Sequence, residues 1–274
     1  MLSSFWVMLT QMVEENYASE YETNDTLIMG LNLYYSSDIL RNEYISNKCD
    51  KLIIYQLEPL VENHWWSIDK VIASLKGADE IWDYDLDNIE ILKTYGINAK
   101  FKPIVYTNSL KRIQKNDSPD IDVLFFGTPT TYRSKFIENF ISGYEFINND
   151  FIANTYANLS IVSIVHISDH RLDELISRSK IILNLNPYEG VTRQQQTRIF
   201  YPLINDKCVM SQRSNRNYFG NCIIEFDNHQ DFGDKVIELI GKDTWRNYPT
   251  FTNYPSFSKD RTDYESFLNR KLIT

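Results

Sequence analysis

Two stretches of the sequence combine residue types that could bind a phosphate group. In the first, Asp122–Arg133, an apolar run ends at Gly127 and a threonine-rich turn leads into a predicted helix. A glycine at the end of a buried strand lets backbone approach a ligand, and helix amino-terminal amides beside Arg133 suit a phosphate. The same stretch also fits an ordinary strand–helix turn with threonine caps. No Gly-Lys-Ser/Thr follows, which excludes a P-loop.

The second stretch runs from Ser179 to Ser211. An apolar strand is followed by a polar loop, Asn184–Gly190, and then by a predicted helix that opens at Arg193. Arg193 and Arg198 diverge by about 140° on an ideal helix, so they cannot both face one ligand without help from the loop. Arg198 has apolar neighbours within the helix and is the better candidate. Its guanidinium could hold a diphosphate with paired hydrogen bonds.

A candidate general base follows the predicted strand 51–57. Glu58 stands at its end, and a loop with His64, Trp65 and Trp66 comes next. A carboxylate at a strand end could deprotonate a hydroxyl group, and burial would raise its pKa toward that use. Alternatively, Glu58 caps a helix or forms an ion pair, His64 is an exposed loop residue, and the tryptophans pack rather than stack on a ligand.

Asp83 and Asp85 have the spacing of a metal-binding Asp-x-Asp pair. Because Asp85 precedes a predicted helix, where aspartate is a favoured N-cap, capping is the preferred interpretation. We therefore expect no metal site here.

These residues are positioned by alternating short apolar runs and longer amphipathic runs, which predict an α/β fold with mostly parallel sheets. The expected strands are 27–33, 51–57, 80–82, 100–105, 122–126, 160–166, 181–186, 208–211 and 222–225. The expected helices are 68–75, 86–95, 132–141, 169–177, 193–204, 231–240 and 260–272. The polar interval 108–120 is the expected linker between a lobe of residues 1–107 and a lobe of residues 108–240. The segment 241–274 could pack back on the first lobe.

Charge, cysteine content and apolar content argue against several classes of protein. A net charge of −9 over 274 residues, with no basic run, argues against nucleic acid as a partner. Three widely spaced cysteines indicate neither a disulfide framework nor a zinc site, so a reducing cytoplasm is expected. No segment has the roughly 20 apolar residues of a spanning helix. Apolar residues of the first 13 positions form one stripe of a predicted helix, which could be a packing element, a dimer contact or a membrane-edge anchor.

Four segments, in order, resemble compact GT-B glycosyltransferases such as spore-maturation-type proteins and small viral and bacterial enzymes: Ile81–Asn88, Phe125–Arg133, the run before the donor loop (DELISRSKIILNL), and Glu189 through Ser211. The resemblance covers about Leu75 to Ser211. It implies two Rossmann-like lobes with a cleft between them, an acceptor lobe before the linker and a donor lobe after it. It also implies transfer of a sugar from a nucleotide diphosphate sugar, by default a UDP-sugar, to a glycan hydroxyl, with no metal or other cofactor.

The resemblance also implies roles for individual residues. Gly127, Thr128 and Arg133 would line the donor phosphates, and the loop around Ile167–Ser168 would meet the base. The sugar and diphosphate would face Glu189, Gly190 and Arg198. One departure is that Tyr201 replaces the glutamate that many GT-B enzymes use to bind the donor ribose.

Two other functions fit the same residues. A nucleotide-sugar epimerase of this fold would need no acceptor. A non-catalytic binding module would bind the donor without turnover, which the Tyr201 departure favours.

Overall fold

The computed structural model describes residues 4–30, 50–61, 67–139, 141–147, 150–155, 159–164 and 169–248. His64, Trp65, Trp66, Ile167, Ser168 and the helix expected at 260–272 lie outside these ranges. The chain divides into two units. Tyr17–Ile104 forms what we term the first unit, and the described residues up to Asn16 and from Val105 onward form the second unit.

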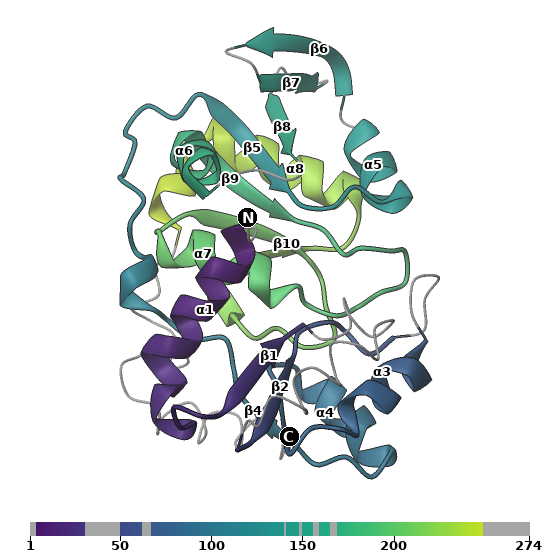
Figure 1. Ribbon diagram of the computed structural model, residues 1–274. Helices are drawn as coiled ribbons and strands as arrows, with labels where there is room; N and C mark the ends of the chain where they lie inside the picture. Colours follow the sequence, from purple (N-terminus) through teal and green to yellow (C-terminus); the bar gives the residue numbers. More distant parts are fainter. Residues whose placement is uncertain are drawn as a thin grey trace. The chain divides into compact units, whose positions relative to one another are not determined.

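The first unit contains a four-stranded parallel sheet in the order β1-β2-β3-β4 (Figure 1). Its strands are β1 (Thr26–Met29), β2 (Leu52–Gln56), β3 (Glu80–Asp83) and β4 (Ala99–Phe101), and its helices are η1 (Ala18–Glu20), α3 (Ile68–Leu75) and α4 (Leu86–Thr94). Every residue of β2 is buried, as expected for a central strand covered on both faces. Leucine and isoleucine side chains of β2, α3 and α4 pack together as the core.

The second unit contains a seven-stranded sheet in the order β11-β10-β9-β5-β8-β7-β6 (Figure 1). Its five parallel strands are β5 (Ile121–Phe126), β8 (Ser160–Ile164), β9 (Ser179–Asn184), β10 (Cys208–Gln212) and β11 (Ile224–Phe226). The antiparallel strands β6 (Ile141–Ile147) and β7 (Asp150–Thr155) extend the sheet beyond β8. Its helices are α1 (Ser4–Tyr17, whose last residue falls in the first unit), α5 (Thr131–Glu138), α6 (Asp169–Arg178), α7 (Gln196–Ile204) and α8 (His229–Gly241), with short η3 (Asn108–Leu110), η4 (Gly220–Cys222) and η5 (Thr244–Asn247).

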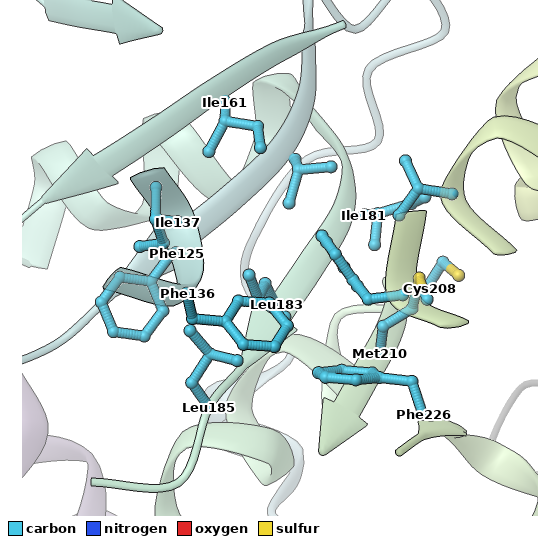
Figure 2. Packing of buried hydrophobic residues seen from close by; sticks show 13 residues of the cluster. Phe125, Phe136, Ile137, Ile161, Ile181, Leu183, Leu185, Cys208, Met210 and Phe226 are labelled. Carbon is cyan, nitrogen blue, oxygen red and sulfur yellow. The ribbon is translucent and has the colours of Figure 1, made fainter. Parts of the chain in front are cut away.

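Helices cover both faces of this sheet, and the side chains of each strand point alternately toward one face and the other. Val123 and Phe125 of β5, with Ile181 and Leu183 of β9, pack against phenylalanines of α5 and α8 in one cluster (Figure 2). Helices α6 and α7 contact β5, β9 and β10 but contribute nothing to that cluster. They therefore cover the opposite face, as in doubly wound sheets.

Helix starts follow capping rules. Asp85 accepts a hydrogen bond from the Asp87 amide at the start of α4, which confirms the N-cap prediction. Thr130 and Asn228 cap α5 and α8 in the same way.

The amino-terminal helix groups with the second unit, whereas the sequence placed it in a lobe of residues 1–107. Leu9, Met12 and Val13 of the predicted apolar stripe are buried. The burial of Leu2, Phe5 and Trp6 lies outside what the structure describes. The Glu15 carboxylate also accepts hydrogen bonds from the amides of residues 108 and 109. The chain consequently divides between Ile104 and Val105 and again between Asn16 and Tyr17. Within the described residues, no helix has both the length and the apolar character needed to cross a bilayer.

The prediction of an α/β chain with mostly parallel sheets is confirmed. Some local predictions were wrong. The helix expected from Arg193 begins at Gln196, and the strand expected at 100–105 ends at Phe101. The hairpin β6–β7 was missed. Gly143 lies within β6 and the pairing register shifts beside it, so the hairpin lacks a clean period-two pattern.

Candidate functional site

The order of strands marks one edge of the second unit's sheet as a site. From β5 the chain passes to β8 on one side of β5, and then returns to β9 on the other side. Strand order therefore reverses at β5. In open α/β sheets, ligands bind at the carboxyl ends of the strands where this reversal occurs. The candidate site accordingly lies where β5 ends at Phe126 and β9 ends at Asn184.

Gly127 and Arg198 meet at this position. Gly127 follows β5 with φ of 147°, a conformation that favours glycine. A Cβ atom placed on it would lie 2.4 Å from Nη1 and 2.6 Å from Cζ of Arg198. The missing side chain thus leaves the space that the guanidinium occupies. Arg198 is the third residue of α7 rather than a mid-helix residue, so its charge adds to the positive end of the helix dipole.

Arg133 connects the loops after β5 and β9. Its side chain is 2% exposed, and its guanidinium donates to the carbonyl oxygens of Thr128 at 2.9 Å, Leu185 at 2.8 Å and Asn186 at 3.2 Å. The Thr130 hydroxyl adds a bond to the Pro187 carbonyl at 2.6 Å. Arg133 was expected to line the donor phosphates, but these bonds direct its guanidinium toward backbone carbonyls. The guanidinium therefore joins the loops after β5 and β9.

Other predicted ligand residues lie on the surface of these loops. Thr128 is exposed after β5, and Glu189 and Gly190 are exposed in the loop after β9. Gly190 has φ of 79°, which a tight turn requires. Arg193 is buried in the loop that precedes α7, so the expected helical divergence between Arg193 and Arg198 does not apply.

Two buried asparagines, Asn184 at the end of β9 and Asn186 two residues beyond it, were not predicted as site residues. Asn184 is 2% and Asn186 is 1% exposed. Among the residues that the structure describes, the Oδ1 atoms of both side chains have no hydrogen-bond partner. Buried polar atoms normally have partners, so these oxygens point to a ligand or water. The signal in the sequence was that Asn184 and Asn186 stand at the end of the otherwise apolar predicted strand 181–186.

Tyr201 lies on α7 and is buried. Its hydroxyl donates to Asp173 of α6 and accepts a 3.0 Å hydrogen bond from Arg112 Nε. Burial, followed by the hydrogen bond to Asp173, raises the pKa of Tyr201. Asn205 accepts from the Arg112 and Ile113 amides and holds the same segment on α7. Tyr201 therefore helps to hold the segment around Arg112 against α6 and α7.

In the first unit, the segment around Glu58 is held from β3 and α4. Asn88 donates to the Glu58 carbonyl at 2.9 Å and to Asp83 Oδ2 at 3.0 Å, and it accepts from the Leu60 amide at 2.8 Å. Glu58 itself is half-buried, two residues beyond β2. Asp83 and Asp85 accept from backbone amides, and no group of three His, Cys, Asp or Glu side chains that could hold a metal ion occurs within the described ranges.

Comparisons with known proteins gave no matching family model and no curated relative. Solved structures that are similar in fold include the following three. TarM shares 10% identity with a TM-score of 0.49, over 90% of this chain and 54% of its own. T4 phage BGT in complex with UDP and Mn²⁺ shares 13% identity with a TM-score of 0.45, over 82% of both chains. Sucrose-phosphate synthase from Thermosynechococcus elongatus shares 8% identity with a TM-score of 0.49, over 98% of this chain and 79% of its own.

The chain therefore spans about half the length of TarM. With identities of 13% or less and TM-scores below 0.5, the function of the chain has to be inferred from its own residues.

Proposed function

We propose that the chain is a glycosyltransferase that moves a sugar from a nucleotide diphosphate sugar, by default a UDP-sugar, to a glycan hydroxyl. The observation that carries the proposal is the placement of Arg198 against Gly127 at the strand-order reversal. A guanidinium there, in the first turn of α7, suits a diphosphate through charge and paired hydrogen bonds. The four segments that resemble GT-B enzymes support sugar transfer over other uses of a diphosphate.

The chemistry would be displacement at the anomeric carbon of the donor. Arg198 would stabilise the negative charge that develops on the leaving diphosphate, and the dipole of α7 would add to this effect. Arg133 would contribute indirectly, because it holds the loops after β5 and β9. Glu58 is the proposed base that deprotonates the acceptor hydroxyl if the reaction inverts configuration.

The proposed reaction is independent of a metal ion, because Arg198 provides the positive charge. The aspartates with metal-binding spacing support this, since each is engaged elsewhere. Asp83 accepts from the Asp85 amide at 2.8 Å, and Asp85 accepts from the Asp87 amide at 2.9 Å. Their carboxylates stabilise the turn into α4.

A thermal-shift screen against UDP-, GDP-, dTDP- and CMP-sugars, with hydrolysis followed in the same wells, tests the proposal. One nucleotide class should stabilise the protein, by about 2.7 kcal/mol at a hundredfold excess over Kd. Arg198→Ala should remove about 1.5–3 kcal/mol of binding free energy. Arg246→Ala is the matched control, because Arg246 is a surface arginine that pairs with Asp243 on η5.

The outcomes separate the candidate functions. No stabilisation by any nucleotide sugar would overturn the donor-site proposal. Stabilisation without hydrolysis or transfer would instead support a non-catalytic binding module. An isomerised sugar formed without an acceptor would identify an epimerase.

A further inference from the structure

We infer that Asn184 and Asn186 accept hydrogen bonds from hydroxyl groups of the transferred sugar and so determine which donor sugars bind. This inference rests on the proposed function and assigns the sugar subsite to buried side chains. Glu189 and Gly190, which were expected to face the sugar, are exposed farther along the same loop.

The amide orientation of Asn184 is fixed by its neighbours. Its Nδ2 donates to the Ser211 hydroxyl oxygen at 2.9 Å, and Ser211 uses its own proton to bond the Gln212 carbonyl at 3.2 Å. Because that proton is engaged, Ser211 acts as the acceptor for Asn184. The atom of Asn184 that is left over is therefore the oxygen, which only accepts hydrogen bonds.

Asn186 is fixed even more completely. Its Nδ2 donates to the Val191 carbonyl at 2.6 Å, its backbone N–H donates to Gln212 Oε1 at 3.2 Å, and its carbonyl accepts from Arg133 Nε at 3.2 Å. A carbonyl cannot donate, so Nδ2 must face Val191 and Oδ1 must face the other way. Every polar group of Asn186 except Oδ1 thus has a partner among the described residues.

The chemistry of these two oxygens selects the kind of ligand group. Phosphate oxygens are acceptors and cannot bond an amide oxygen, so the diphosphate belongs to Arg198. Uracil offers one N–H donor, whereas the ribose and the hexose both offer hydroxyl donors. We assign the two acceptors to the hexose, which offers the larger number of hydroxyl groups, and titration with UDP tests the nucleoside as the alternative. A buried acceptor left without a donor weakens binding, so sugars lacking the matching hydroxyl are rejected.

The decisive variant is Asn184→Leu, which removes the oxygen and keeps the number and branching of the side-chain heavy atoms. Ser211 keeps its bond to the Gln212 carbonyl, so the ligand-free melting temperature should change little. The Kd for UDP-glucose should increase roughly 5- to 30-fold, as loss of one good hydrogen bond predicts. The Kd for UDP alone should not change. Asn184→Val removes the same oxygen if leucine is poorly accommodated.

The matched control is Asn205→Leu. Asn205 is also buried, but its Oδ1 and Nδ2 both bond backbone groups of the second unit. This variant should lower the melting temperature and leave the Kd for UDP-glucose unchanged. The two variants should therefore show opposite patterns of stability and affinity.

Calorimetric titration with UDP-glucose, its monodeoxy analogues and UDP completes the test, or the same set for the nucleotide that the screen selects. Wild type should discriminate against at least one deoxy sugar, and Asn184→Leu should lose that discrimination. Equal Kd values for wild type and Asn184→Leu would overturn the inference and leave the proposed function intact. Weaker binding of UDP itself would assign the asparagines to the nucleoside and also overturn it. Failure of wild type to bind any nucleotide sugar would overturn both.

Discussion

Arg198 lies so close to Gly127 that a methyl group on the glycine would come within 2.4 Å of Nη1 of Arg198. Gly127→Ala should therefore displace the guanidinium, which can move because it ends a flexible side chain. The φ of 147° adds backbone strain of about 1–3 kcal/mol. We expect a lower free energy of unfolding together with loss of the Arg198-dependent affinity for nucleoside diphosphates, measured by urea unfolding and calorimetric titration.

Gly96→Ala is the control that separates the effect of backbone strain from the effect of displacing the Arg198 guanidinium. Gly96 has φ of 74°, but a Cβ there would meet nothing within 4 Å. This variant should lose stability without any change in affinity. If Gly127→Ala binds nucleoside diphosphates as tightly as wild type does, the contact between Gly127 and Arg198 does not shape the site.

The lowered pKa of Glu80 in β3 predicts that the first unit loses stability in acid. Burial opposes ionisation, but hydrogen bonds from Lys100, Lys51 and Trp82 outweigh it and lower the pKa of Glu80 to about 2, from 4.5 in an unfolded chain. Between these two values the unfolded state binds the extra proton, so stability falls as pH falls through this window. The shift corresponds to at most about 3 kcal/mol, and solvent screening reduces this.

Glu80→Gln should therefore be less stable than wild type at about pH 6 and should approach it at about pH 2.5. Urea unfolding followed by tryptophan fluorescence measures this difference. Glu238→Gln is the control, because Glu238 pairs with Lys242 on the surface of α8 at 61% exposure and should change little at either pH. A constant difference between wild type and Glu80→Gln across the window would contradict the assignment.

Local patterns in the sequence were sufficient to predict the alternation of strands and helices. The apolar runs that form β5 and β9, and the cap at Asp85, are each encoded within a few neighbouring residues. The hairpin β6–β7 was missed because its stability depends on pairing with β8, and its own residues show no strong period. The amino-terminal stripe was predicted, but the unit on which it packs depends on contacts with residues 108 and 109.

Several residues of the site could be identified from the sequence, but the directions of their side chains could not. Gly127 and Arg198 were both identified, and only the fold shows that they touch. Arg133 stands beside a glycine turn, where an arginine can face either a phosphate or backbone carbonyls. The deciding acceptor, Leu185, is 52 residues away. Unpartnered oxygens such as those of Asn184 and Asn186 can be recognised only when the surrounding bonds are known.

The Arg133 guanidinium donates hydrogen bonds to carbonyl oxygens of two loops, so its substitution should lower stability. Lysine keeps the charge but cannot reproduce planar bonds to three carbonyls, so Arg133→Lys should lose about 2 kcal/mol or more of unfolding free energy without any ligand present. Arg246→Lys, at an exposed ion pair, should lose less than about 1 kcal/mol. Urea unfolding of both variants measures these losses. If Arg133→Lys is as stable as wild type and only binds nucleoside diphosphates more weakly, Arg133 contacts the ligand and does not position the loops.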